Sequence, residues 1–293
     1  MRKNGRTLFF ILLLVGLCVW FYNKKSTAHA PETIPSVATA SPETPAPAIP
    51  DPLPVSTPTL EYQALTLTTD TPGKEIVTAL GGYDNLAAFL SLNRVDDKHL
   101  QKEMTVVIPS TFEDPWAFTG FPRSFPALST IPKIMLISQR TQEFGAYEYG
   151  QLVRFGGIST GKKTTPTKNG LYHTNWKAKE TTSTVNDEWL LKWNFNIDNL
   201  DGIGIHEYEL PGYPASHSCI RLSAADAEWF YNWADQWKLS RDEQTVLAQG
   251  TPVVIFGTYE FGVKAPWKKL AEDPTILALT DAEIQTITTA VAD

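Results

Sequence analysis

The residues best suited to chemistry lie between His206 and Arg221, in the second half of a chain of 293 residues. Cys219 stands there, with His217 two residues before it. A thiol with the ordinary pKa of about 8.5 is a poor nucleophile at neutral pH unless a base or a positive charge favours the thiolate, and an imidazole is the usual activator. The sequence therefore predicts a cysteine nucleophile that works with a histidine.

Three side chains can assist this thiol. His206 follows the stretch 202–205, which is typical of a strand, so it can approach from an adjacent strand. In an extended backbone, residues two apart share a face, and we expect His217, Cys219 and Arg221 to point the same way. Arg221 would then place a fixed positive charge beside the thiol, suited to a substrate carboxylate.

The second cysteine of the chain, Cys18, lies in an apolar run that follows a basic head. The run, residues 8–22, is shorter than the roughly 20 residues of an ordinary spanning helix and fits a signal peptide or a short uncleaved anchor. Either one predicts that the body is exported to the periplasm or cell wall, and an anchor would hold it at the inner membrane. The exported body then has one thiol and no internal disulfide, which favours catalysis.

Composition and pattern divide the chain into five parts. A signal or anchor occupies 1–30, and a proline-rich linker that cannot bury a core occupies 31–59. We expect a small domain at 60–110, a catalytic domain at 131–260 and a C-terminal helical extension at 261–293.

The small domain is predicted to have the order βααβ. Strands are expected near 62–67 and over 105–108, with helices over 74–80 and 84–92. This order and the phrase at 90–95 resemble a LysM-type peptidoglycan-binding module. The alternative is a small α/β spacer that binds no ligand.

The larger body is predicted to be mainly β because aromatic residues and alternating runs recur through it. Strand-like runs lie at 134–138, 145–149, 152–158, 171–176, 189–197, 203–208 and 253–256. One helix follows the cysteine: Ser223 caps it, Asp226 completes a capping box, and Trp229, Trp233 and Trp237 form one apolar stripe that we assign to the core.

Two further helices are expected. A short one over 241–249 would be capped by Ser240 and ended by Gly250, and a peripheral one over 281–291 would be capped by Thr280.

Two short motifs of the body resemble those of the L,D-transpeptidase catalytic domain, also called the YkuD domain. The first is His206 after an apolar strand, then Ser-His-Ser-Cys-Ile-Arg at 216–221. The second is Ser-Thr-Gly at 159–161, followed by Thr-Pro at 165–166 and by Gly170. The resemblance implies a β-sandwich-like catalytic domain with a few peripheral helices.

The resemblance, which spans about residues 131–258, also implies roles. Cys219 would be the nucleophile and His206 the general base, with the backbone carbonyl of Glu207 orienting the imidazole. His217 would support the site, and the amide of Cys219 would face the developing oxyanion. The residues expected to contact substrate are Tyr213, Ser216, Ser218 and Arg221.

Two positions and the length of one spacer depart from the family pattern. Ser218 replaces a glycine, which would crowd the backbone near the substrate carbonyl. Glu207 stands where the family usually has Gly or Ser, although a backbone carbonyl is retained there. The spacer 207–215 is shorter than usual, which is tolerable if the flanking strands still meet.

The implied reaction is a ping-pong acyl transfer on peptidoglycan stem peptides, in cell wall biogenesis and the maintenance of cell shape. Cys219 attacks the carbonyl that joins the third residue of a tetrapeptide stem to its terminal D-Ala, and a thioester remains. An amine of a second stem then accepts the acyl group, which forms a 3-3 cross-link. With water as acceptor, the protein would be an L,D-carboxypeptidase. No cofactor or metal is expected.

Other classes of function remain as alternatives. A zinc hydrolase could use His206, His217 and Cys219 as ligands, and a non-catalytic wall-binding scaffold would make Ser218 the mark of a decayed site. A papain-like peptidase would place its cysteine before its histidine, which is the reverse of the order here. The formal charge of −7 and a pI of about 5.3 argue against nucleic acid as a partner. Lysines at 162, 163 and 168 are expected to lie on a solvated loop, and the alternative is that they steer an anionic substrate.

Overall fold

The computed structural model describes residues 60–183 and 190–292. The predictions for the apolar run, for Cys18 and for the proline-rich linker therefore concern residues outside these ranges. In the described ranges, no helix is both long enough and apolar enough to cross a membrane. Contacts between residues group the described residues into one compact unit.

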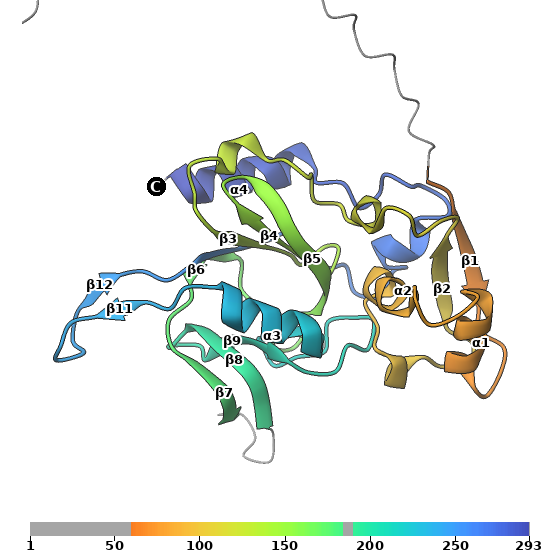
Figure 1. Ribbon diagram of the computed structural model, residues 1–293, viewed down its shortest axis with the longest axis horizontal. Helices are drawn as coiled ribbons and strands as arrows, with labels where there is room; N and C mark the ends of the chain where they lie inside the picture. The colour runs from red at the N-terminus through yellow and green to blue at the C-terminus, as the bar shows by residue number, and fades with distance from the viewer. Residues whose placement is uncertain (1–59, 184–189, 293) are drawn as a thin grey trace, which may run out of the picture. The chain divides into compact units, whose positions relative to one another are not determined.

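Within the described residues, one sheet of nine strands forms the larger body, which is mainly β as predicted (Figure 1). In spatial order its strands are β6 (Gly170–His173), β13 (Pro252–Phe256), β3 (Ile134–Ser138), β4 (Glu143–Glu148), β5 (Gln151–Ser159), β10 (Ile220–Leu222), β9 (Ile203–Glu207), β8 (Leu190–Asp198) and β7 (Lys177–Thr182). Two neighbouring pairs, β13 with β3 and β10 with β9, are parallel, and the other pairs are antiparallel.

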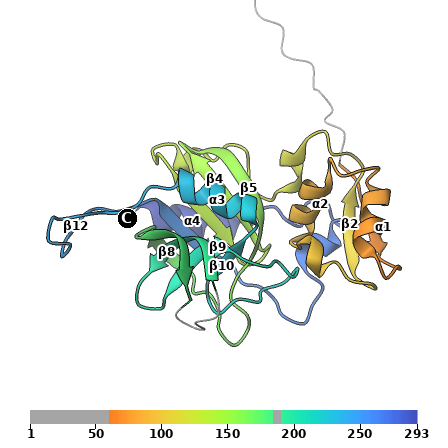
Figure 2. The same cartoon turned by 60° about the horizontal axis from the view of Figure 1, so that its bottom comes forward.

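The sheet curls so that its two halves face each other across one apolar core (Figure 2). Phe144 from β4, Phe195 from β8 and Ile205 from β9 belong to the same buried cluster as Phe230 of helix α3 (Ala224–Trp233). The predicted sandwich is thus one continuous sheet folded over on itself, with α3 packed into the core between the halves.

Strand β3 is buried on both faces, which explains its uninterrupted apolar sequence. Met135 faces the cluster between the halves, while Leu136 faces a second cluster that includes Ile287 of helix α4 (Asp281–Ala292). The predicted C-terminal helix and its cap are confirmed: the Thr280 hydroxyl accepts from the amide of Glu283 at 3.2 Å, and the Glu283 carboxylate accepts from the amide of Thr280 at 2.9 Å.

The N-terminal part of the described chain has the predicted βααβ order. Strand β1 (Tyr62–Thr66), helix α1 (Pro72–Ala79), helix α2 (Leu86–Asn93) and strand β2 (Thr105–Pro109) follow in sequence, and β1 pairs with β2 antiparallel. We refer to residues 60–110 as the N-terminal unit. Its likeness to a LysM module stays a prediction. Short 3-10 turns lie at Asp97–His99, Pro115–Phe118, Pro126–Leu128 and Pro266–Lys269.

The N-terminal unit packs directly on the sheet. Gly157 of β5 permits the close approach, because a Cβ at this position would lie 2.8 Å from the carbonyl oxygen of Ser91 in α2. Arg94, which follows α2, is buried and reaches the carboxylate of Glu143 in β4 at 3.3 Å. It also donates to the carbonyl of Thr141 at 3.1 Å, so a buried cation joins the unit to the sheet.

The predicted helix over 241–249 is wrong. Strands β11 (Lys238–Leu239) and β12 (Val246–Ala248) form a small hairpin there. The Ser240 hydroxyl accepts from the amide of Thr245 at 2.9 Å and closes the turn. Serine binds nearby backbone groups in turns as well as at helix starts, so its presence did not distinguish the two.

Helix α3 also differs from its prediction. Ser223 caps it by accepting from the amide of Asp226 at 3.2 Å, as predicted. The Asp226 carboxylate, however, accepts from the Ser223 hydroxyl at 2.7 Å instead of completing a reciprocal capping box. The helix ends at Trp233, because Ala234 is extended, so Trp237 lies beyond the stripe on which Trp229 and Trp233 stack with centroids 4.9 Å apart.

Replacing Arg94 by alanine should lower the free energy of unfolding by about 3–5 kcal/mol, because the Glu143 carboxylate would be left buried and unpaired. Arg123→Ala is the matched control, since Arg123 pairs with Asp114 at an exposed site and should cost less than about 1 kcal/mol. Denaturant unfolding of both variants measures the difference. Equal losses would contradict a connecting role for the buried pair.

Candidate active site

The pairing of β9 with β10 determines where the chemical residues lie. In this parallel pair, Arg221 is opposite His206 and Ile220 is opposite Ile205. Ile205 and Ile220 point into the apolar core, so His206 and Arg221 project from the other face of the sheet. Cys219 directly precedes β10. The flanking strands therefore meet despite the short spacer between histidine and cysteine.

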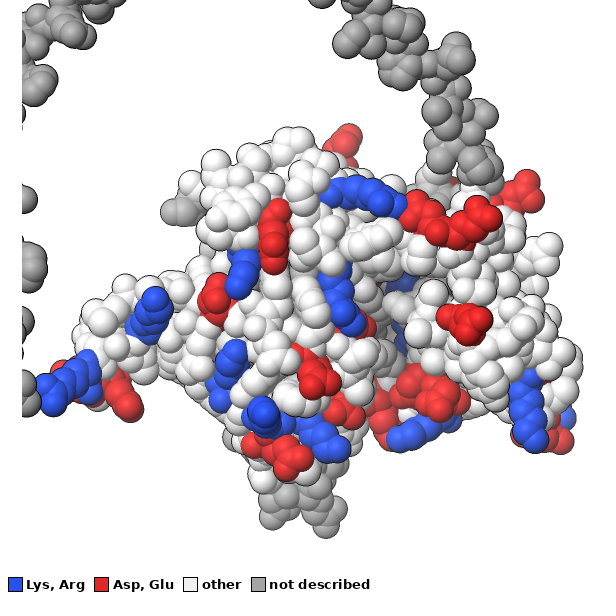
Figure 3. Space-filling view, in the orientation of Figure 1, with Lys and Arg blue, Asp and Glu red and all other residues white. Residues whose placement is uncertain are grey.

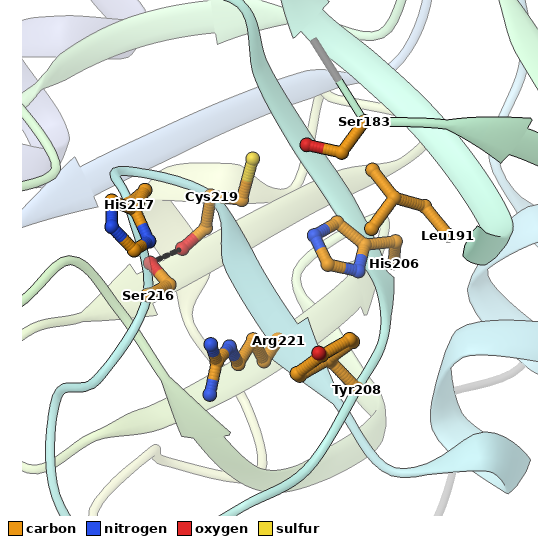
Figure 4. A pocket seen from close by; sticks show the side chains of 8 residues that line it. All are labelled: Ser183, Leu191, His206, Tyr208, Ser216, His217, Cys219 and Arg221. Atoms are coloured by element: carbon orange, nitrogen blue, oxygen red, sulfur yellow. Dashed lines mark hydrogen bonds between the residues drawn. The ribbon is translucent and has the colours of Figure 1, made fainter. Parts of the chain in front are cut away.

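A pocket of about 330 Å³ opens on this face (Figure 4). Its lining includes five residues named by the sequence and three that were not. The five are His206, Ser216, His217, Cys219 and Arg221, and the three are Ser183, Leu191 and Tyr208. In the view of Figure 4, the His206 ring lies to one side of Cys219 and the His217 ring to the other.

His206 is held as a neutral base. Its side chain is 4% exposed, and Nδ1 lies 2.9 Å from the backbone carbonyl oxygen of Glu207, which is the contact expected from the sequence. A carbonyl only accepts, so Nδ1 carries the proton and Nε2 of the neutral ring has a free lone pair. Burial lowers the pKa of His206 to about 4, against a raising effect of the Glu207 carbonyl and together with Arg221.

The Cys219 thiol is also neutral at rest. Burial raises its pKa, and this outweighs the lowering by the Gly204 amide and by Arg221. Sγ lies 3.7 Å from the carbonyl oxygen of Gly202. The charge of Arg221 therefore does not produce a resting thiolate, because desolvation of the sulfur is the larger effect. A proton must leave the thiol as it attacks.

The backbone before Cys219 is not extended as predicted. Ser218 has a φ of +84°, in the left-handed region, so strand alternation does not relate His217 to Cys219. Glycine adopts this conformation without cost, whereas a side chain there costs roughly 1 kcal/mol. The conformation gives a physical reason for the glycine that the family pattern has at this position.

The second sequence motif supports the loop that carries the cysteine. Thr165 Oγ1 donates to the carbonyl of Ser216 at 3.1 Å, and Thr167 Oγ1 donates to the carbonyl of Ser218 at 2.8 Å. The amide of Ser216 donates to the carbonyl of Thr160 at 3.0 Å. The sequence did not show that these residues hydrogen-bond to the backbone of the loop and fix its position.

Ser216 itself holds the nucleophile in place. Its side chain is buried, and its hydroxyl donates to the carbonyl of Cys219 at 2.5 Å. Tyr213, also expected to contact substrate, is exposed and does not line the pocket. Its carbonyl accepts from the hydroxyl of Ser159 at 2.8 Å, so it too helps to position the loop.

Lys162 is not the solvated lysine that the sequence suggested. Its Nζ lies 2.9 Å from Nε2 of His217. An ammonium only donates, so Nε2 accepts and the proton of neutral His217 resides on Nδ1. Burial, then Lys162 and Arg221, lower the pKa of His217. By contrast, Lys168 pairs with Asp201 and Lys163 is exposed.

Arg221 is held by residues that immediately follow the histidine. Its guanidinium carbon lies 4.4 Å from the ring centroid of Tyr208, and Nη1 donates to the carbonyl of Glu209 at 3.4 Å. Tyr208 was missed in the sequence, although its position two residues after His206 puts both on one face of an extended chain.

Residues 132–255 match the L,D-transpeptidase catalytic domain, YkuD. This segment contains both motifs, the parallel β9–β10 pair and all the residues that line the pocket. The resemblance inferred from the sequence is thereby confirmed for the catalytic domain.

Solved L,D-transpeptidases are also similar to the chain. One from Stackebrandtia nassauensis is 21% identical, with 44% of this chain and 57% of that chain covered and a TM-score of 0.36. One from Mycobacterium smegmatis is 18% identical, with 43% and 59% covered and a TM-score of 0.35. A mutant of the Enterococcus faecium L,D-transpeptidase is 21% identical, with 43% and 50% covered and a TM-score of 0.34.

The similarity thus spans between half and three-fifths of those chains. No match was found among curated proteins.

The zinc-hydrolase alternative requires side chains that converge on one ion. No three His, Cys, Asp or Glu side chains within residues 60–183 and 190–292 converge to hold an ion. His206, His217 and Cys219 consequently do not form the three-ligand site that a zinc hydrolase would use.

Replacing Ser218 by glycine should raise the free energy of unfolding by about 1 kcal/mol, because it relieves the left-handed backbone. Among the described residues, the hydroxyl that is lost donates to the carbonyl of Thr165 alone, at 3.5 Å. Ser129→Gly is the control: Ser129 is exposed with a φ of −63°, so this change should destabilise by about 0.5–1 kcal/mol. Denaturant unfolding tests both, and losses of similar size in the two variants would refute the strain at Ser218.

Proposed function

We propose that the protein is a cysteine acyltransferase that acts on peptidoglycan stem peptides, an L,D-transpeptidase. The observation that supports it most is the meeting of Cys219 with a neutral, oriented His206 in one pocket of the matching domain. The proposed substrate lies outside the cytoplasm, in agreement with the predicted export segment. A LysM-like N-terminal unit would hold the enzyme on the same polymer.

The first half-reaction begins from two neutral groups. Sγ of Cys219 attacks the carbonyl that joins the third residue of a donor stem to its terminal D-Ala, and the thiol proton passes to Nε2 of His206. The imidazolium then gives this proton to the departing D-Ala nitrogen as the C–N bond breaks. A thioester on Cys219 remains, and His206 is neutral again.

The second half-reaction uses the same base. An acceptor amine attacks the thioester carbonyl, His206 takes a proton from the amine, and the thiol of Cys219 leaves with that proton. The product is an amide between two stems. With water in place of the amine, the same steps release a shortened stem and a free carboxylate, so the acceptor decides between cross-linking and trimming.

The charges around the pocket suit a donor with a carboxylate next to the cleaved bond. Arg221 lines the pocket, and Lys162 contacts His217, which also lines it. Elsewhere, on the face drawn in Figure 3, basic and acidic side chains of the described residues are interspersed, so that face offers no field of one sign. The positive charge that matters for the donor is local to the pocket.

A carbapenem, the kind of compound that acylates the cysteine of this family, should add its full mass to the chain. Intact mass spectrometry should show the adduct in the wild type and in Cys18→Ala, and no adduct in Cys219→Ala. A wild type that stays unmodified would overturn the proposal.

Incubation with a disaccharide tetrapeptide then separates the two reactions: a cross-linked dimer with released D-Ala indicates transpeptidation, and a tripeptide alone indicates carboxypeptidation.

The rate constant of this acylation should fall only at an unusually low pH. His206 must be neutral to accept the thiol proton, and its pKa of about 4 means that it stays neutral well below the ordinary histidine range. The second-order rate constant for acylation, measured from pH 8 downward, should therefore not fall near pH 6.5 and should halve near pH 4. A halving near pH 6.5 would show that a solvated histidine is the base.

A further inference from the structure

The loop between His206 and Cys219 is hydrogen-bonded to the N-terminal unit. The amide of Asp96 donates to the carbonyl of Leu210 at 2.8 Å, and the amide of Leu210 donates to Oδ2 of Asp96 at 2.8 Å. The next residues along, Val95 and Pro211, form an isolated bridge. A short strand-like contact thus connects the unit to the segment that joins the base to the nucleophile.

Asp96 is itself fixed in orientation. Its Oδ1 accepts from the amide of His99 at 3.0 Å and lies 2.7 Å from Nδ1 of the same histidine. Nε2 of His99 lies 3.8 Å from a carboxylate oxygen of Glu209. Both carboxylate oxygens of Asp96 are thus engaged, one within the N-terminal unit and one on the active-site loop.

The position of Leu210 bears on the pocket because its neighbours hold Arg221. Leu210 is buried, the carbonyl of Glu209 accepts from Arg221, and the Tyr208 ring lies against the guanidinium. A shift of Leu210 would move these two residues first. The spacer of residues 207–215 is short, so little chain is available to absorb a shift before His206 or Cys219.

We propose that Asp96 is a positioning residue for acyl transfer, acting through Leu210, and that the N-terminal unit is part of the active-site scaffold. The inference rests on the proposed function. It gives the unit a role in catalysis that is separate from any binding of glycan. It also explains how a shortened loop keeps a fixed shape: the missing length is replaced by contacts with a different part of the chain.

The test compares three variants of the full chain in carbapenem acylation. Asp96→Ser keeps a side-chain oxygen that can cap the amide of His99 but is too short to reach Leu210. Asp96→Asn keeps an oxygen that can accept from Leu210. Asp97→Ser is the matched control, since Asp97 is the adjacent acid and its exposed side chain makes no contact with the loop among the hydrogen bonds of the described residues.

Asp96→Ser should lower the maximal acylation rate constant by about 10- to 100-fold, the size expected for small misplacement of reacting groups, with less change in the half-saturating concentration. Asp96→Asn should recover most of the rate, and Asp97→Ser should match the wild type. Thermal unfolding midpoints of all variants identify any that fail to fold, and the comparison between Asn and Ser then uses the folded fractions.

Two results would overturn the inference while the proposed function stands. One is acylation of Asp96→Ser at the wild-type rate; the other is equal slowing in Asp96→Asn and Asp96→Ser with unchanged unfolding midpoints. A wild type that forms no adduct would instead remove the proposed function, and the positioning role with it.

Discussion

The parallel register of β9 and β10 is the constraint on which the site depends. It sets His206 opposite Arg221 while Ile205 and Ile220 face inward, so the burial of two isoleucines determines where a base and a cation appear. A slip of one residue would turn the apolar pair outward and the polar pair into the core. The hydrophobic core therefore defines the chemistry on the opposite face of the sheet.

Around this pair, polar contacts fix the backbone of the loop that carries Cys219, while the reacting thiol and imidazole stay uncharged. Ser216, Thr165 and Thr167 hold the backbone before Cys219, and Asp96 holds the segment after His206. The thiol remains uncharged because burial raises its pKa more than Arg221 lowers it, and the imidazole remains uncharged because burial and Arg221 both lower its pKa. Geometry is prepared in advance, and charge develops only during the proposed reaction.

The fold was largely predictable where burial is simple. Strand β3 was recognised from its uninterrupted apolar run, and helix α4 from the capping residue at its start. Both signals come from residues that are close in sequence. Strand β7 was missed because Lys177–Thr182 is polar and lies at the sheet edge, where little burial is required. The helix predicted over 241–249 was wrong because a serine such as Ser240 is as common in turns as at the start of helices.

The candidate site was predictable in its residue types and less so in its geometry. The motif named Cys219 and His206, and the structure places both in one pocket. The motif could not show that Ser218 has a positive φ, since a serine residue by itself does not indicate the left-handed region. The contacts of Lys162 and Asp96 depend on segments 55 and 114 residues away in sequence, and no local pattern carries such pairings.

The raised pKa of Cys219 has a consequence for the reaction of its sulfur with oxidants. Peroxides and disulfides are attacked by the thiolate, so a sulfur that stays protonated at rest reacts slowly with them and resists conversion to sulfenic acid or to a mixed disulfide. A permanently ionised nucleophile would be consumed by its surroundings between encounters with substrate. The desolvated sulfhydryl is instead shielded from redox damage, and its nucleophilicity is reserved for the moment when an adjacent imidazole can take its proton.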